Sequence, residues 1–154
     1  MGPIKSKNIS MEIESMISTK VFLDTAYAIA LSSSTDAHHR KAIELAEQLE
    51  SNNVQLITAR PVVLEIGNAL ARPRYRQAAV ALLQSLERDP KVEIVPLTEE
   101  LYAQGFDLFQ NRTDKEWGIT DCISFVIMRE RGLSEALTTD EHFEQAGFVA
   151  LLRE

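Results

Sequence analysis

Short apolar runs alternate along this chain with longer segments in which apolar residues recur every three or four positions. An uninterrupted apolar run predicts a strand buried on both faces, and the longer spacing predicts a helix with one apolar face. The predicted strands span residues 20–23, 54–58, 92–95, 136–138 and 148–151. Helices between successive strands favour right-handed crossovers. The pattern therefore predicts one α/β/α layered domain around a central, mostly parallel sheet.

Residues that favour the first or last turn of a helix mark the helices between these strands. Thr35 or Asp36 is expected to cap one helix, because a short polar side chain accepts from the free N–H groups of a first turn. Pro61 is expected to open another, since proline has no N–H to leave unpaired there, and Gly132 to end a third. The predicted helices are 25–31, 36–51, 61–70, a segment around 79–86, a segment from Thr98 to a polar loop at 111–118, 123–129 and 141–145.

Length and composition agree with one globular domain. The 154 residues are 45% hydrophobic, which suffices for a core without disulfides. Residues 1–18 lack the periodic pattern, so we expect a flexible leader or an added segment there and the folded domain at 19–154. Cys122 is the single cysteine, which favours a reducing, cytoplasmic setting. No apolar run approaches the roughly 20 residues that span a bilayer, so no membrane association is expected.

The net charge of −7 argues against a general nucleic-acid binder, because phosphate binding depends on cationic surface. A bound cation would neutralise part of this acidity. Arg72, Arg74 and Arg76 also form a local basic cluster, which we expect to bind phosphates or an acidic partner segment. The competing interpretation is an ordinary solvated surface.

Four acids lie where predicted strands give way to helices or within a neighbouring helix: Asp24, Glu65, Asp121 and Asp140. Acids at the carboxyl ends of parallel strands face the crevice where ligands bind. Converging carboxylates repel one another, so they need protons or a cation. Hard oxygen ligands select Mg²⁺ or Mn²⁺. Taken singly, each acid is also explained as a helix cap or an exposed helix residue.

Other phosphate-handling classes lack their motifs. A haloacid dehalogenase-type phosphatase needs a second Asp two residues after the first, where this chain has Ala26. A P-loop ending in Gly-Lys-Ser or Gly-Lys-Thr is absent, as are the dinucleotide-binding Gly-x-Gly-x-x-Gly and the Cys/His spacing of a zinc site.

Four segments of the chain together resemble the motifs of PIN-domain nucleases. They are Val21-Phe22-Leu23-Asp24-Thr25, Pro61-Val62-Val63-Leu64-Glu65 with Asn68, Trp117-Gly118-Ile119-Thr120-Asp121-Cys122-Ile123-Ser124, and Leu137-Thr138-Thr139-Asp140 with His142 and Phe143. The resemblance covers residues 20–151 and extends in size and layout to VapC-type toxins of bacterial toxin–antitoxin pairs. It predicts a three-layer PIN-like fold.

The resemblance also implies an activity and a site. It implies a metal-binding core of Asp24, Glu65 and Asp121, completed by Asp140 directly or through water. It implies Mg²⁺- or Mn²⁺-dependent endoribonuclease activity that leaves 5′-phosphate and 3′-hydroxyl ends, with one ion or two left open. A small cognate antitoxin and a homodimer are implied as partners. The competing hypothesis is a PIN-fold binding module with weak or no nuclease activity.

The roles of nearby residues are expected as follows. Hydroxyl groups are candidates to orient carboxylates, water or phosphate, although local capping is the competing role: Thr25, Thr120, Ser124 and Thr139. With RNA as the substrate, Arg72, Arg74 and Arg76 are the substrate-binding candidates. His142 is expected to have a surface or packing role, and Trp117 to anchor its loop against the core.

Overall fold

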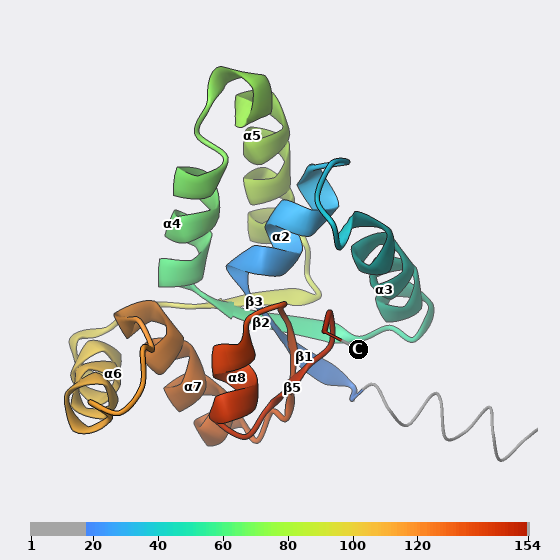
Figure 1. The fold of residues 1–154 in the computed structure, drawn as a ribbon. Helices are drawn as coiled ribbons and strands as arrows, with labels where there is room; N and C mark the ends of the chain where they lie inside the picture. The colour runs from blue at the N-terminus through green and yellow to red at the C-terminus, as the bar shows by residue number, and fades with distance from the viewer. Residues whose placement is uncertain (1–17, 154) are drawn as a thin grey trace, which may run out of the picture.

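A five-stranded, all-parallel sheet lies at the centre of the computed structural model, which describes residues 18–153 (Figure 1). The strands are β1 (Lys20–Leu23), β2 (Gln55–Ala59), β3 (Val92–Val95), β4 (Glu135–Leu137) and β5 (Val149–Ala150). Their order is β3-β2-β1-β4-β5, and every neighbouring pair is parallel. The predicted α/β/α class is therefore confirmed, with β1 as the central strand.

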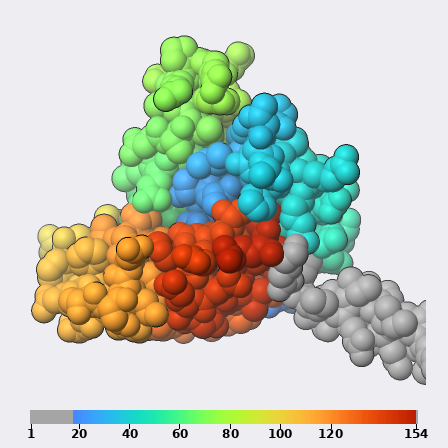
Figure 2. Space-filling model, viewed as in Figure 1, coloured from blue at the N-terminus to red at the C-terminus, as the bar shows by residue number. Residues whose placement is uncertain are grey.

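Helices cover both faces of the sheet. One layer holds α2 (Thr25–Ser32), α3 (His39–Ser51), α4 (Arg60–Ala69) and α5 (Pro73–Arg88), and the other holds α6 (Glu99–Asn111), α7 (Ile119–Arg131) and α8 (Glu141–Gln145) (Figure 1). In the space-filling view, α2 lies between the α4–α5 hairpin, α3 and the C-terminal segment (Figure 2). The first helix after β1 is therefore flanked by segments distant in sequence.

The core follows from the apolar run of β1. Val21 and Phe22 are fully buried, because this strand has helices on both faces. The Phe125 ring on α7 meets the rings of Trp117 and Phe143 edge-on, with centroids 5.0 and 4.9 Å apart. The Trp117 indole N–H also donates to Gln145 Oε1 at 3.0 Å. The expectation that Trp117 anchors its loop is confirmed, and the same aromatic cluster holds α8 in place.

Several predicted boundaries were wrong. The helix α3 begins at His39, and neither Thr35 nor Asp36 is its N-cap, because Asp36 Oδ1 accepts the N–H of His38 inside the preceding turn at 2.8 Å. The helix predicted at 123–129 begins four residues earlier, so Asp121 lies in the first turn of α7. Gly132, with a φ of +66°, ends α7 as predicted, since this backbone conformation favours glycine.

Helix α6 packs closely on α7, the helix that carries Asp121. A Cβ atom on Gly105 of α6 would collide with the Ile123 side chain and lie 3.2 Å from the Cα of Ile123, so glycine allows this close approach. The expected leader, residues 1–18, lies outside the described residues apart from Ser18. Within 18–153, no helix combines the length and apolarity needed to cross a membrane.

Candidate active site

The carboxyl ends of β1 and β4 bring Asp24 and Asp140 to one edge of the sheet. The two strands are neighbours, and the N–H of Asp24 donates to the Leu137 carbonyl at 3.3 Å. Thr138 follows β4, and its hydroxyl donates to Asp24 Oδ2 at 2.7 Å while accepting the N–H of Asp140 at 3.0 Å. This fully buried threonine thus orients one acid and the backbone of another.

Sequence reasoning missed Thr138, the residue directly before the predicted Thr139. The role predicted for the Thr139 hydroxyl stays a prediction, and the Thr139 backbone carbonyl accepts a hydrogen bond from Arg153 at 3.3 Å. Adjacent residues after a strand point to opposite sides, so one of two adjacent threonines faces Asp24. The Thr-Thr dipeptide was a signal for a hydroxyl at this position, and the strand register decides which one.

Asp24 is a buried carboxyl among other acids. Its side chain is only 7% exposed. Burial raises its pKa to about 7, and the nearby Asp121 and Asp140 add to this shift, whereas hydrogen bonds from Thr138 and the backbone of Thr25 oppose it. A carboxylate in this position is stabilised by a positive charge, because water is excluded and the neighbours are acidic.

Asp121, Asp140 and His142 form a second part of the site. Asp121 comes from the first turn of α7, Asp140 is the N-cap of α8, and each offers an oxygen near the His142 ring. His142 Nδ1 lies 3.1 Å from Asp121 Oδ2 and 3.3 Å from Asp140 Oδ1. One ligand atom from each residue lies within 4.8 Å of the others. Burial raises the pKa of Asp121, and the hydrogen bond with His142 opposes the rise.

Glu65 reaches the same region from α4. Its side chain is exposed, and Glu65 Oε2 accepts the hydroxyl of Thr25 at 3.0 Å. Because Thr25 directly follows Asp24 and begins α2, this bond links Glu65 to the residue next to Asp24. Of the other predicted hydroxyl groups, that of Ser124 is fully buried and donates to the Thr120 backbone carbonyl at 2.9 Å. In the described part of the chain, the Ser124 hydroxyl therefore bonds to a backbone carbonyl and not to a carboxylate.

The three arginines lie away from the sheet edge. All three are exposed: Arg72 lies in the turn between α4 and α5, and Arg74 and Arg76 lie at the start of α5, at the end of the hairpin remote from the sheet (Figure 1). A ten-residue helix is about 15 Å long, which separates this turn from the start of α4. Arg76 donates to the Ala71 carbonyl, and Arg74 lies over the Tyr75 ring at 4.5 Å. Closeness in sequence to Glu65 therefore does not place them among the acids.

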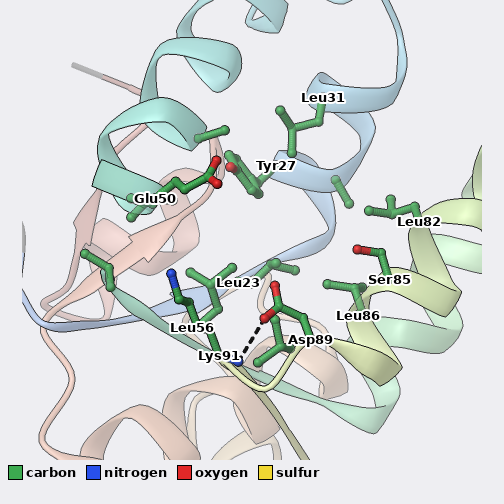
Figure 3. A pocket seen from close by; sticks show the side chains of 15 residues that line it. Leu23, Tyr27, Leu31, Glu50, Leu56, Leu82, Ser85, Leu86, Asp89 and Lys91 are labelled. Carbon is green, nitrogen blue, oxygen red and sulfur yellow. Dashed lines mark hydrogen bonds between the residues drawn. The ribbon is translucent and has the colours of Figure 1, made fainter. Parts of the chain in front are cut away.

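A separate cavity of about 480 Å³ lies between α2, α3, α5 and the sheet (Figure 3). Its lining is mostly apolar and includes Leu23, Leu49 and Leu86. Tyr27 also lines it, and burial raises the pKa of the phenol to about 12. None of the four acids lines this cavity, although Leu23, which does, directly precedes Asp24.

The donor set fits a hard divalent cation. Burial and the charges of Asp121 and Asp140 raise the pKa of Asp24, and burial and the charge of Asp140 raise the pKa of Asp121. Carboxylate oxygens are the ligands that Mg²⁺ and Mn²⁺ prefer. Asp121 and Asp140 can supply ligand atoms close to each other. The fold and this site define an α/β/α domain with an acidic edge, suited to a cation, at the carboxyl ends of its strands.

A family model for the PIN domain matches residues 21–149, a range that includes all four acids. The chain belongs to the PIN domain family. It is 30% identical over 129 residues to the 23S rRNA-specific endonuclease VapC20 of Mycobacterium tuberculosis, and the match covers 84% of this chain and 95% of that protein.

Solved structures agree with this assignment. The crystal structure of VapC20, a sarcin-ricin loop cleaving toxin, matches with a TM-score of 0.75 at 29% identity, covering 84% of this chain and 96% of that one. FitAcB from Neisseria gonorrhoeae matches with a TM-score of 0.58 at 19% identity, covering 84% and 94%, and supports the fold alone.

Proposed function

We propose that this protein is a divalent-metal-dependent endoribonuclease and the toxin of a type II toxin–antitoxin pair. The observation that carries the proposal is the convergence of Asp24, Asp121 and Asp140 at one sheet edge, with Glu65 tied to Thr25 beside them. Its support from relatives is the similarity to VapC20, whose substrate is 23S rRNA. That RNA is therefore the first substrate to test.

Asp24, Glu65, Asp121 and Asp140 would hold Mg²⁺ or Mn²⁺. When bound, the ion lowers the pKa of a coordinated water and neutralises charge that develops on the phosphate. The chain's own residues prepare this site: Thr138 orients Asp24, and Thr25 orients Glu65. Their hydrogen bonds hold the carboxylates before substrate arrives, which reduces the reorganisation needed during reaction.

The direct test is cleavage of 23S rRNA by the purified protein with Mg²⁺. Product ends should carry 5′-phosphate and 3′-hydroxyl groups, and EDTA should stop the reaction. Cleavage that continues in EDTA would contradict a metal-dependent mechanism. RNA or protein binding without any cleavage would instead support the second candidate, a PIN-fold binding module, for which the net charge of −7 and the small number of lysines argue.

For Arg72, Arg74 and Arg76 we propose a role in binding RNA phosphates. Their exposure leaves them accessible to a long substrate that extends from the acids along the α4–α5 hairpin. Replacing all three by alanine should lower the slope of log K against log salt by about 0.7 for each phosphate that an arginine had neutralised. Arg40→Ala, an exposed arginine on α3, is the control. An unchanged slope in the triple variant would assign the cluster to solvent or to a protein interface.

For the expected homodimer we propose the exposed aromatic face of α6. Tyr102, Phe106 and Phe109 are 49, 43 and 44% exposed and recur at helical spacing. The first two rings stack with centroids 6.2 Å apart. A contiguous apolar patch on a protein surface marks an interaction site.

Sedimentation at micromolar concentration should therefore give a species of twice the chain mass. Phe106→Glu should convert it to monomer, because the new charge would be buried in the interface. Val80→Glu on α5, which is 45% exposed, is the matched control and should leave the dimer intact. A parent protein that sediments only as a monomer would reject the proposal.

The apolar cavity is the surface we assign to the expected antitoxin. An amphipathic helix binds a groove by burying its apolar side chains, and the leucines of α2, α3 and α5 offer such a lining (Figure 3).

A further inference from the structure

A single histidine contacts two of the four acids. The His142 ring is half-buried, and its Nδ1 lies within hydrogen-bond distance of carboxylates from two different helices, α7 and α8. A surface or packing role, as expected from the sequence, leaves these two contacts unexplained. The bond to Asp121 satisfies hydrogen-bond geometry at 3.1 Å.

The position of this ring is set by its neighbours. Asp140 caps α8 and accepts the backbone N–H of His142 at 2.8 Å. The next residue, Phe143, is fully buried against Phe125 and Phe22. One side of α8 is thereby anchored in the core, and the histidine is held over the acids.

Asp121 and Asp140 use their two carboxylate oxygens in the same way. Asp121 Oδ2 accepts from the Gly118 N–H and contacts the ring, and Asp140 Oδ1 accepts the backbone N–H of His142 and contacts the ring. Within residues 18–153, no hydrogen bond reaches Asp121 Oδ1 or Asp140 Oδ2. Each carboxylate thus uses one oxygen for the protein and keeps the other for a ligand.

We propose that His142 is a positioning residue of the metal site, whose Nδ1–H holds Asp121 and Asp140 so that their second oxygens face the ion. The inference rests on the proposed metal-dependent nuclease function. Hydrogen bonding to ligands is the common role of residues around a metal site. Direct ligation by the imidazole fits Mg²⁺ and Mn²⁺ less well, because these ions prefer oxygen.

The test compares two substitutions by the affinity of the metal-free protein for Mn²⁺, measured from the electron paramagnetic resonance signal of the free ion. His142→Ala removes the donor and should weaken Mn²⁺ binding about 10- to 100-fold. His142→Asn places an amide N–H at about the position of Nδ1 and should retain affinity within a few-fold of the parent. Equal losses in both variants would indicate direct ligation and overturn the proposal, as would full affinity in His142→Ala.

A matched control and a kinetic readout separate this role from a general structural one. His38 makes a similar contact, with Nδ1 3.7 Å from Asp36 Oδ1 before α3, and His38→Ala should leave Mn²⁺ affinity unchanged. With RNA, His142→Ala should lower kcat at limiting Mn²⁺, recover at saturating Mn²⁺ and keep its KM. A raised KM with unchanged kcat would place the ring on the RNA instead and overturn the proposal.

Folding of the variants is checked by circular dichroism in EDTA. If His142→Ala does not fold, His142→Gln takes its place, because the longer amide reaches the position of Nε2 and not Nδ1. Gln should then lose affinity where Asn keeps it, and the reverse order would overturn the proposal. A parent protein that binds no Mn²⁺ would reject the proposed function itself, whereas a binding parent with unaffected variants rejects only the role of His142.

Discussion

Replacing Asp24 or Asp121 by asparagine should reduce Mg²⁺-dependent RNA cleavage by a factor of about 1,000 or more. The substitution removes a negative charge that we assign to the metal and nearly preserves the side-chain shape. Loss of about 4 kcal/mol of stabilisation in the transition state corresponds to this factor, since each 1.36 kcal/mol changes the rate tenfold. Initial rates on 23S rRNA at saturating Mg²⁺ measure the effect.

The fold should survive both substitutions. At Asp24, an asparagine oxygen can still accept the Thr138 hydroxyl, and at Asp121 one can still accept the Gly118 N–H. Asp107→Asn, an exposed carboxylate on α6, is the matched control and should cleave RNA at the parental rate. If the Asp24 and Asp121 variants were as active as the parent, the cleavage would come from a contaminating nuclease.

In the absence of metal, the protein should become less stable as the pH rises from about 4 to 7. Burial raises the pKa of Asp24 from its usual value of 3.8 to about 7 in the folded state. Between these values the folded protein holds a proton that the unfolded chain has released, so the free energy of unfolding falls with increasing pH. The raised pKa of Asp121 acts in the same direction.

The expected loss is a few kcal/mol, because one pKa unit corresponds to about 1.4 kcal/mol. Asp24→Asn should remove most of this pH dependence and make the metal-free protein more stable than the parent at pH 8. Saturating Mg²⁺ should raise the stability of the parent at pH 8, since a ligand of the folded state shifts the equilibrium toward it. Urea unfolding at pH 5 and pH 8, in EDTA and in Mg²⁺, measures all three.

The pH dependence of the free energy of unfolding tests the acidic site without any measurement of activity. A parent and an Asp24→Asn variant with the same pH dependence in EDTA would show that Asp24 ionises as freely as an exposed acid. The burial of Asp24 beside Asp121 and Asp140 would then not impose the electrostatic cost from which we infer a cation.

The pattern of apolar and polar residues was enough to predict the sheet and the acids at its edge. The run Val21-Phe22-Leu23 contains no polar residue, which in a protein of this size places the strand at the centre with helices on both faces. Acids that follow parallel strands, such as Asp24 and Asp140, emerge at the same edge whatever the details of packing. Strand ends were less predictable, because β5 has two residues where four were expected.

The pattern of apolar and polar residues did not predict contacts between segments that are distant in sequence. The pairing of Thr138 with Asp24 spans 114 positions, and that of His142 with Asp121 spans 21. No periodicity encodes which of two adjacent threonines faces an acid, or that a histidine in a short helix lies over two carboxylates. The arginine cluster shows the converse: it stays near Glu65 in sequence, yet helix α4 carries it away from the sheet.

The sequence by itself therefore determined the order of elements, the layered class and the residue types that converge, because local periodicity and strand direction suffice for these. Only the tertiary structure decided the hydrogen-bond partners of each acid, the burial that raises the pKa of Asp24 and the place of His142. The reason is physical: solvation and hydrogen bonding depend on which side chains the packed core brings together, and those neighbours come from other parts of the chain.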